Sequence, residues 1–464
     1  MRFIALIVIV VLAGTLIVPA QNTFIVDFDS VQMGFNAPAY SVEELSDGGF
    51  LVGSIQKWHD GDTTGRTHVI LRRTDAQGQV LHERAVHHNA NRTYNNGLFG
   101  AMVRDDTLLV SGITSYGPDP YECSLSLYWF NEDGDTVKTK ELLSFGTPDS
   151  TFIQHWQTIQ TLDGGFAIAG EGGPLSQSAQ AIVTVVGLSG DTAWYRSYGN
   201  DNEGERGYSL AQLQDGGFVL SGVHSGGGPQ NDHMLIRTDS IGNQLWRRQY
   251  GNLGWKIPSV RMAVDGNIVT YSDYKEGLGS GAWQQIELRK WSLGGVLMWS
   301  KKSHWSPNSS SVPGDFEVLP DGSIVCSIWH AGACHIAKFT ADGDSLWSRG
   351  YVVYAAWGVS ENMPYDIDPT SDGGFVVCGE TEQGINDPTP GLQTMFLIKT
   401  DSMGCVVPGC HLVGVQEYAF DLQSYLKLFP NPVAQGGVAT VALDLPDGVD
   451  VGPVELVVQD VMGR

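Results

Sequence analysis

Charged residues and long apolar runs are both scarce in this sequence. Asp, Glu, Lys and Arg together form only 17% of the 464 residues, whereas glycine occurs 58 times and aromatic residues reach 10%. This balance favours short strands joined by tight turns over long surface helices. Beyond residue 20, no stretch approaches the roughly 20 apolar residues that a membrane-spanning helix needs. The hydrophobic fraction of 42% nevertheless supports a sizeable core and excludes wholesale disorder.

Positive charge is also in short supply. The chain has 27 basic and 51 acidic residues, which gives a formal net charge of -24 at pH 7. Such a surface repels nucleic acid phosphates and anionic lipid, so neither is expected as a partner. The acidic excess is typical of a soluble extracellular protein, and a calcium-rich surface is the alternative interpretation. Calcium is therefore the one ion to consider, and no cofactor is predicted.

The first twenty residues are organised like a secretory signal peptide. Arg2 provides a positive start, residues 3–18 form an apolar run, and Val18-Pro19-Ala20 places small residues before Gln21. We therefore predict a signal peptide over residues 1–20. The mature chain is expected to be exported, soluble and without a transmembrane segment.

Internal repetition is the strongest signal in the chain. One repeated element is an Asp-Gly-Gly-Phe turn followed by an apolar strand that ends in glycine. Its clear copies are Asp47-Gly48-Gly49-Phe50, Asp163-Gly164-Gly165-Phe166, Asp215-Gly216-Gly217-Phe218 and Asp372-Gly373-Gly374-Phe375. Degenerate copies begin at Asp105, Asp265 and Asp321. The seven copies recur about every 54 residues from Asp47 to Asp372.

A second element alternates with the first and consists of an apolar strand, a Thr-Asp-x-x-Gly turn and an outgoing strand. The turn is clear at Thr74–Gly78, Thr238–Gly242 and Thr400–Gly404, and weaker copies centre on Gly134, Gly190, Gly295 and Gly343. The count is again seven. A tryptophan follows the turn glycine by four residues in four copies, at Trp194, Trp246, Trp299 and Trp347. We expect these rings to share one face and to pack between neighbouring sheets.

Two hairpins per unit give four strands per unit. Asp-Gly supplies the positive φ angle that a tight hairpin turn requires. Sevenfold repetition of four-stranded sheets predicts an all-β fold, a seven-bladed β-propeller over residues 21–412. The last unit lacks an outgoing strand, which the segment Thr23–Phe28 could supply. Closing the ring with both chain ends would remove an exposed sheet edge.

The repeat pattern resembles a family of exported proteins. Asp-Gly-Gly-Phe-x-x-x-Gly, then Leu-Ile-Lys-Thr-Asp-Ser-x-Gly, then Trp-x-x-x-Tyr-Gly is similar to the propeller-like repeat proteins that Bacteroidota secrete. The resemblance covers about 390 of the 464 residues and is best at 215–251 and 372–404. It is weakest in the second unit, where Asp105-Asp106-Thr107 replaces Asp-Gly-Gly.

The C-terminal segment extends this resemblance. Leu426–Val433, which contains Phe-Pro-Asn-Pro, is similar to the opening of a type IX secretion C-terminal sorting domain, and 454–464 is similar to its middle. The resemblance implies a linker at 413–425, a sorting domain at 426–464, and the type IX secretion machinery as a partner. It also implies release from the cell or attachment to its outer surface. The domain stops after about 39 residues, so we expect the sequence to be incomplete at this end.

The six cysteines offer one strong disulfide pair, because exported chains support disulfides. Cys405 and Cys410 flank Val-Val-Pro-Gly, a turn-like spacer. Cys326 and Cys334 lie on neighbouring predicted strands and are either a second disulfide or free buried thiols. The remaining two, Cys123 and Cys378, are interpreted as buried thiols.

Residues with the chemistry of metal ligands occur in three places. Cys326, His330, Cys334 and His335 fall on one hairpin, where alternate side chains point to opposite faces, so a shared metal is not expected. Asn131–Asp135 and Asp342–Asp344 resemble pieces of calcium loops. Neither continues to the bidentate Glu of a full loop, and both coincide with the repeated turn, so they are interpreted as turns.

The long connections of the predicted ring are the expected place for function. Antiparallel order puts both short turns of each unit on one face and the longer connections on the other, and loops on a rigid scaffold commonly carry function. Five aromatic residues in these connections are candidate ligand-binding residues: Trp58, Tyr116, Tyr121, Trp255 and Trp305. Their rings could stack on sugars, and the ordinary alternative is that the loops pack on one another.

The leading functional hypothesis is a secreted or surface-displayed binding protein, without catalysis, for carbohydrate or protein. No nucleophile motif, phosphate loop or dinucleotide fingerprint stands out, and no catalytic or metal-binding residue is predicted. The alternative is an extracellular polysaccharide hydrolase or lyase with carboxylates at the mouth of the central channel, because glycosidase chemistry needs two carboxyl groups. A structural spacer or adhesin component is the third hypothesis.

Overall fold

The structure is a computed structural model of the whole chain. It describes residues 22–28, 38–57, 67–86, 92–94, 99–103, 107–116, 123–131, 133, 135–145, 151–174, 178–199, 203–225, 232–251, 258–276, 283–303, 310–353, 361–382, 393–407, 410, 426–429 and 440–443. These residues are almost entirely β-strand and turn, which agrees with the predicted all-β class. Within them, no helix has the length and apolarity to cross a membrane.

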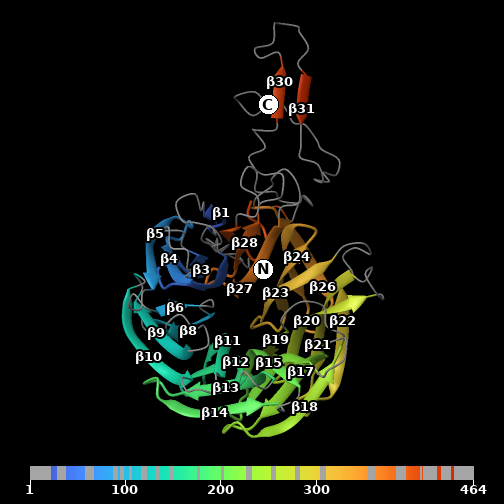
Figure 1. Cartoon of the computed structure of the whole chain (residues 1–464). Helices are drawn as coiled ribbons and strands as arrows, with labels where there is room; N and C mark the ends of the chain where they lie inside the picture. Colours follow the sequence, from blue (N-terminus) through green and yellow to red (C-terminus); the bar gives the residue numbers. More distant parts are fainter. Residues whose placement is uncertain are drawn as a thin grey trace, which may run out of the picture.

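Most strands belong to antiparallel sheets of four that follow one another along the chain and surround a central axis (Figure 1). Listed from the innermost strand outward, the first sheets are β2 (Ala39–Glu44), β3 (Phe50–Lys57), β4 (Thr67–Thr74) and β5 (Val80–Val86); β11 (Thr151–Gln160), β12 (Phe166–Pro174), β13 (Gln180–Val186) and β14 (Thr192–Tyr198); and β15 (Gly204–Gln212), β16 (Phe218–Ser225), β17 (Asp232–Thr238) and β18 (Gln244–Tyr250). The later sheets are β19 (Ser259–Met262), β20 (Ile268–Glu276), β21 (Trp283–Trp291) and β22 (Leu297–Ser303); β23 (Ser311–Val318), β24 (Ile324–His330), β25 (Ala333–Phe339) and β26 (Ser345–Tyr351); and β27 (Glu361–Pro369), β28 (Phe375–Glu382), β29 (Gln393–Thr400) and β1 (Phe24–Phe28).

The predicted number of blades needs correction: the structure has six four-stranded blades, not seven. The second repeat forms a five-stranded sheet instead, with β6 (Arg92–Tyr94) and β7 (Phe99–Val103) both paired to β8 (Thr107–Tyr116), followed by β9 (Cys123–Asn131) and β10 (Thr136–Phe145). This is the unit whose turn sequence, Asp105-Asp106-Thr107, lacks the glycines of the other copies. The count of five arises at the inner edge of the sheet, because Arg92–Tyr94 pairs with Thr114–Tyr116 and Phe99–Val103 pairs with Thr107–Ser111 of the same strand, β8.

The innermost strands form a closed ring around the axis. In order, β2, β7, β11, β15, β19, β23 and β27 each contact the next, and β27 contacts β2. The two ends of the propeller meet as predicted, because β1 pairs antiparallel with β29, with Phe24 opposite Lys399 and Phe28 opposite Met395. The N-terminal strand therefore completes the last blade and covers its edge.

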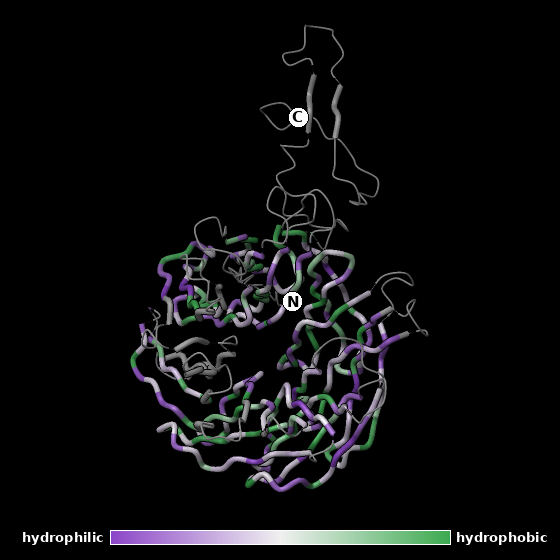
Figure 2. Tube along the Cα trace, viewed as in Figure 1, coloured by the Kyte–Doolittle hydropathy of each residue, from purple (hydrophilic) through white to green (hydrophobic). Residues whose placement is uncertain are grey.

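The core lies between neighbouring sheets. The middle strands are almost fully buried, as in β16, whereas the outermost strands, such as β18, are largely exposed. One apolar cluster joins Ala167 and Val183 of one blade to Leu210, Phe218 and Leu220 of the next. Figure 2 shows hydrophilic residues along the outer strands of the ring.

The repeated tryptophans bind each blade to its neighbour. Trp194 lies against Gly242, where an added Cβ would come within 2.8 Å of the indole ring, and the Trp194 Nε1–H donates to the carbonyl of Ser240 at 3.2 Å. Trp246 donates in the same way to Leu293 at 2.9 Å. In the closing strand the corresponding ring is that of Phe24, which lies against Gly78. The expected packing of these rings between sheets is confirmed.

Of the two cysteine pairs considered as disulfides, one is bonded and the other is not. Cys405 and Cys410 are bonded, whereas Cys326 and Cys334 are free, buried thiols. In the pairing of β24 with β25, Cys326 lies opposite Ala337 and Cys334 lies opposite Trp329, so the two thiols are not neighbours across the hairpin. Cys378 is a buried thiol as predicted.

Two further strands, β30 (Leu426–Phe429) and β31 (Thr440–Leu443), pair antiparallel with each other. They lie in the segment that resembles a sorting domain, most of which is outside the described residues.

Candidate functional site: the central cavity

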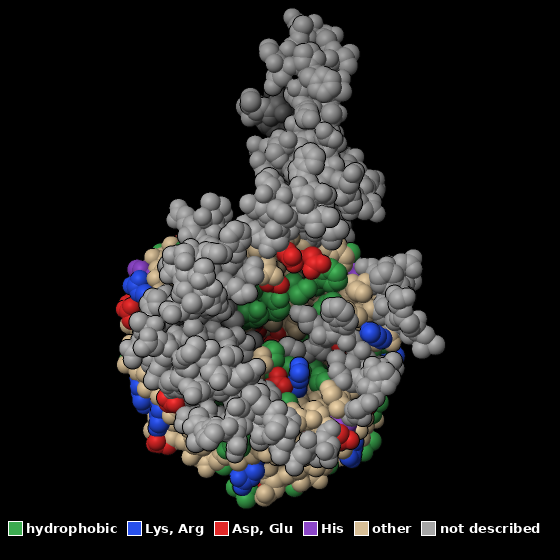
Figure 3. Space-filling model, viewed as in Figure 1, with side chains coloured by type: hydrophobic (Ala, Val, Ile, Leu, Met, Phe, Trp, Pro, Cys, Tyr) green, Lys and Arg blue, Asp and Glu red, His purple; other side chains and the backbone are tan. Residues whose placement is uncertain are grey.

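The side chains of the five aromatic residues selected from the sequence all lie outside the described part of the structure. Trp58, Tyr121, Trp255 and Trp305 are outside the described residues. For Tyr116 the structure describes only the backbone, at the end of β8. At the axis of the ring, the innermost strands enclose a cavity of about 420 Å³. The space-filling view shows this hollow near the centre of the ring, with side chains of both charge signs around it (Figure 3).

The residues that line the cavity occupy fixed positions in the repeat. Counted back from the turn Asp of each unit, all of them except Thr158 and Pro313 lie four, six or seven residues earlier, near the end of the innermost strand. The position at minus four contributes Glu43, Ile159, Arg261, Glu317 and Asp368. The position at minus six contributes Ser41, Gln157, Ser209, Ser259, Asp315 and Asp366. The position at minus seven contributes Tyr40, Trp156, Tyr208, Gly314 and Tyr365.

A β-bulge explains why adjacent positions both face the cavity. Side chains of a regular strand alternate between its two faces, so minus six and minus seven should diverge. The pairing of the innermost strand with its neighbour slips by one residue at this point in four blades, at Ala39/Ser41, His155/Gln157, Gly207/Ser209 and Pro364/Asp366. The skipped residue in each case is the aromatic one. Bulges are known to redirect side chains in this manner beside functional sites.

The cavity is therefore layered along the axis. The aromatic residues lie farthest from the short turns, toward the face of the long connections, and the residues at minus four lie nearest the turns. Two aromatic pairs form the first layer: the rings of Tyr40 and Tyr365 lie 4.9 Å apart, and those of Trp156 and Tyr208 also lie 4.9 Å apart. A ligand that enters from the long-connection face meets these rings first and the charged residues below them.

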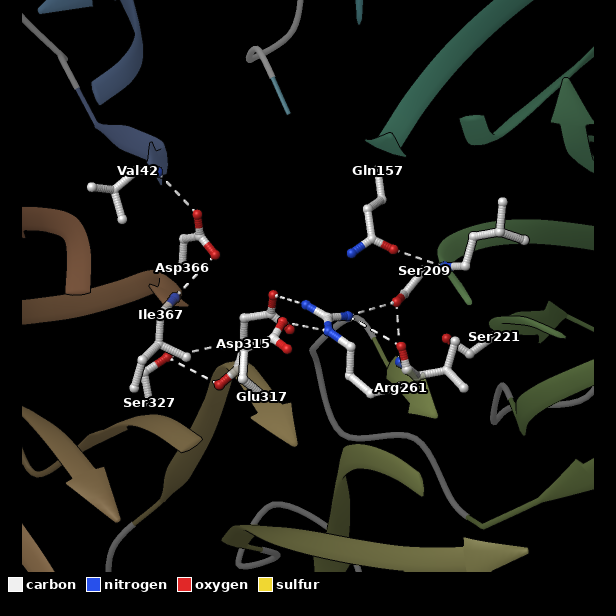
Figure 4. Close-up of polar contacts among 12 residues, drawn as sticks. Val42, Gln157, Ser209, Ser221, Arg261, Asp315, Glu317, Ser327, Asp366 and Ile367 are labelled. Atoms are coloured by element: carbon white, nitrogen blue, oxygen red, sulfur yellow. Dashed lines mark hydrogen bonds and ion pairs between the residues drawn. The ribbon is translucent and has the colours of Figure 1, made fainter. Parts of the chain in front are cut away.

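Arg261, on β19, is the one basic residue among the described residues that line the cavity. Its Nη2 donates to Asp315 Oδ2 at 2.6 Å and its Nε donates to Glu317 Oε1 at 2.5 Å (Figure 4). Burial opposes the charge on Arg261, but the two carboxylates outweigh it and raise its pKa. The other oxygen of Asp315, Oδ1, is buried without a hydrogen-bond partner in the described residues.

Three other carboxyl groups, on β2 and β27, form no ion pair with a basic side chain in the described part of the ring: Glu43, Asp366 and Asp368. Asp366 accepts the backbone N–H of Val42 at 3.0 Å through Oδ2 (Figure 4). Burial raises the pKa of Asp366, and the nearby Asp315 carboxylate raises it further. Burial also raises the pKa of Glu43 and of Asp368, and for both the carboxyl of Asp366 adds to the effect. Each of these groups is thus held where ionisation is unfavourable.

The opposite wall is uncharged and well anchored. On β11, Gln157 Oε1 accepts the backbone N–H of Leu210 at 2.7 Å, which leaves its amide nitrogen directed between the two walls (Figure 4). On β15, Ser209 Oγ accepts the backbone N–H of Val260 at 3.0 Å. These bonds hold the amide and the hydroxyl in place, so the wall presents fixed polar groups to a ligand.

The cavity carboxylates are not gathered around one point as metal ligands would be. Among the described residues, only Glu203, Glu205 and His224 bring three ligand atoms within 4.8 Å of one another, and none of the three lines the cavity. There Arg247 already contacts Glu205 Oε1 at 2.9 Å and His224 Nδ1 at 3.0 Å. The guanidinium group of Arg247 therefore already supplies positive charge to that cluster. On the hairpin of β24 and β25, the His330 and His335 rings lie 5.7 Å apart.

No protein-family model and no curated protein matches the chain. Solved structures with a similar fold include an ulvan lyase bound to a GlcA–Rha3S saccharide, with 11% identity over 83% of this chain and 99% of that one and a TM-score of 0.49. The β-propeller domain of the Trilobed protease from Pyrococcus furiosus matches with 10% identity over 79% and 95% and a TM-score of 0.44. A protein of unknown function from Dyadobacter fermentans matches with 11% identity over 68% and 96% and a TM-score of 0.43. Nothing about the site follows from these values.

The sequence contained a signal that would have located this site. The spacing from each turn Asp back to Tyr, Trp, Asp or Glu is constant, so aligning the seven units on that Asp brings the cavity residues into register. The alignment does not reveal the β-bulge. Without it, a strict alternation of side chains would assign the aromatic residues to the buried face of the blade.

Proposed function

We propose that the chain is an exported carbohydrate-binding protein whose ligand occupies the central cavity. The observation that carries this proposal is the layered lining: two pairs of aromatic rings toward the long-connection face, above fixed carboxyl, amide and hydroxyl groups. Ring faces pack against the C–H groups of a sugar, and the polar groups below bond its hydroxyls. A cavity of about 420 Å³ is within the range of small-ligand sites.

The place of action belongs to the same proposal. The features that support it are the signal-like residues 1–20 and the segment from 426 onward that is similar to a type IX secretion sorting domain. On this basis the chain is delivered by that machinery and acts outside the cell or on its outer surface.

The test is titration calorimetry of the full chain against a panel of neutral, amino and acidic oligosaccharides. The variants Tyr40→Leu and Trp156→Leu should each bind about tenfold or more weakly than the unchanged chain, because leucine keeps an apolar side chain but has no ring face. Asp342→Asn, in an exposed turn far from the axis, is the control and should bind as the unchanged chain does. Absence of binding to every saccharide, or binding that survives both cavity substitutions, refutes the proposal.

A second candidate function, cleavage of the bound polysaccharide, is favoured by one observation. Glu43, Asp366 and Asp368 have raised pKa values next to Asp315 and Glu317, which pair with Arg261. A protonated carboxyl near a carboxylate is the combination that glycoside hydrolysis uses as acid and base or nucleophile.

The same panel separates the two functions. After incubation of each bound saccharide with the full chain, released reducing ends indicate hydrolysis, and an unsaturated product that absorbs in the ultraviolet indicates a lyase. If a saccharide binds but neither product forms, the non-catalytic function stands and the second candidate is rejected.

A further inference from the structure

The charges of the cavity are uneven in a way that restricts the ligand. Five carboxyl groups line it, and one basic residue, Arg261, is already paired with Asp315 and Glu317. The described strand β7 of the second repeat has the sequence Phe-Gly-Ala-Met-Val, which contains no charged residue. An anionic ligand would meet this wall of carboxyls with no free base among the described lining residues to receive it.

The hydrogen-bonding groups of the cavity also favour a ligand that donates hydrogen bonds over one that accepts them. Carboxylates only accept, and Asp315 Oδ1 is a buried acceptor that receives no hydrogen bond from any described residue. Glu43 and Asp368 form no ion pair with a basic side chain in the described part of the ring. Because unsatisfied buried acceptors are costly, the missing donors are expected to come from the ligand.

The aromatic layer is compatible with a cation and unfavourable to an anion. The Tyr40–Tyr365 and Trp156–Tyr208 pairs lie at the entrance to the charged layer. The face of an aromatic ring carries partial negative charge and attracts an ammonium group. An ammonium group supplies three donors and no acceptor, which matches the lining in both charge and hydrogen bonding.

We infer that the cavity selects an amino sugar with a free, protonated amine, which would lie against the carboxyl wall formed by Glu43, Asp315 and Asp366. This inference rests on the proposed function, since it names the class of saccharide for that same site. The sugar ring lies between the aromatic pairs and the anchored amide of Gln157. An N-acetylated sugar loses the charge and two donors, and a uronic acid reverses the charge.

The experiment compares three probes of equal length on the full chain by calorimetry at one near-neutral pH: glucosamine oligomers, N-acetylglucosamine oligomers and galacturonate oligomers. The glucosamine oligomer should bind about tenfold or more tightly than its N-acetylated counterpart, because a charge-assisted hydrogen bond to a desolvated carboxylate is lost on acetylation. The galacturonate oligomer should bind most weakly.

Substitutions identify the source of the preference. Glu43→Gln and Asp366→Asn keep the size of each side chain but remove a carboxyl that can ionise beside the bound ammonium group, so the ratio of the glucosamine to the N-acetylglucosamine affinity should fall about tenfold. Asp342→Asn removes a carboxyl from an exposed turn and should leave that ratio unchanged. Thermal unfolding of each variant verifies that it is folded.

The outcomes distinguish this inference from the proposed function. If neutral or acidic oligomers bind as tightly as glucosamine oligomers, the amine selectivity is wrong while the carbohydrate site stands. A preference that is unchanged in Glu43→Gln and Asp366→Asn also overturns the inference, because the amine is then recognised elsewhere. If no saccharide of any class binds, the proposed function fails and the inference fails with it.

Discussion

Asp215, in a turn at one face of the ring, and Asp366, in the central cavity, carry the same functional group in opposite surroundings. Asp215 receives the backbone N–H of Gly217 at 2.9 Å and the Arg237 guanidinium at 2.6 Å, and these contacts lower its pKa. Asp366 has no ion pair with a basic side chain in the described residues, and burial raises its pKa. One environment favours the ionised form and the other opposes it.

The turn arrangement recurs around the ring, whereas the cavity arrangement does not. Four turn carboxylates pair with a basic residue on the third strand of their blade: Asp47 with Arg73, Asp215 with Arg237, Asp265 with Lys290, and Asp372 with Lys399. The cavity carboxyls come from three adjacent inner strands, β23, β27 and β2. A feature shared by several repeats serves the fold. A feature that breaks the symmetry needs another reason, and ligand binding provides one.

The largest expected difference between the two regions concerns their arginines. Arg261→Met leaves the carboxylates of Asp315 and Glu317 buried without their base, so the free energy of unfolding should fall by about 3–5 kcal/mol. Arg237→Met removes the partner of an Asp whose side chain is 53% exposed, and the loss should be about 1 kcal/mol or less. Denaturant unfolding at neutral pH measures both.

A compensating variant tests the cause of the Arg261 effect. Arg261→Met combined with Asp315→Asn and Glu317→Gln removes the stranded charges and should recover most of the lost stability. If the combined variant is as unstable as Arg261→Met alone, packing of the arginine rather than charge accounts for the loss.

An intermediate effect is expected from the pH dependence of the cavity carboxyls. Their pKa values are higher in the folded chain than in the unfolded one, so the protonated forms stabilise the fold. This stability is fully present below the ordinary carboxyl range and is lost as pH rises through the raised values. Glu43→Gln with Asp366→Asn should therefore raise Tm at alkaline pH by about 2–4 °C, and the gain should shrink at acidic pH. Calorimetric scans across pH measure it, and a gain that grows on acidification contradicts the assignment.

The smallest effect is expected at the turn carboxylates, and its pH dependence has the opposite sign. The pKa of Asp215 is lower in the folded chain, so its contribution is present above the unfolded value and is lost as pH falls through the folded one. Asp215→Asn should cost about 1 kcal/mol or less at neutral pH and nothing in strong acid. Denaturant unfolding at the two pH values measures the difference. A loss equal to that of Arg261→Met would remove the distinction between the two regions.

Much of the architecture could be predicted because it depends on local chemistry. The Asp-Gly turns and the repeated apolar strands specify hairpins, and their recurrence specifies a ring. Even the closing strand β1 was predictable, because the last repeat lacks an outer strand. The structure adds that Phe24 takes the place of the tryptophan of other blades. The short Cys405–Cys410 loop likewise defines its own disulfide.

The predicted number of regular blades was wrong, whereas the five aromatic residues proposed as ligand-binding stay a prediction, because the structure does not describe their side chains. The second repeat keeps the spacing of a blade, but two short strands, β6 and β7, pair with β8 in place of one inner strand, so its sheet has five strands. The aromatic residues chosen from the sequence were those in long loops, whereas Tyr40, Trp156, Tyr208 and Tyr365 lie within strands. A strand aromatic is ordinarily a core residue, so composition alone gave no reason to select them.

The sequence by itself determined the turns, the strands, their repetition and the closure of the ring, because each depends on residues that are neighbours in the chain or occupy equal positions in successive repeats. Aligning the repeats puts Glu43, Asp366 and Arg261 near the ends of their innermost strands, but only the tertiary structure decided that these ends enclose one cavity together with the aromatic rings. These residues are far apart in the chain, and it is the ring, together with a one-residue bulge in each of four inner strands, that directs them and the aromatic rings to the same axis.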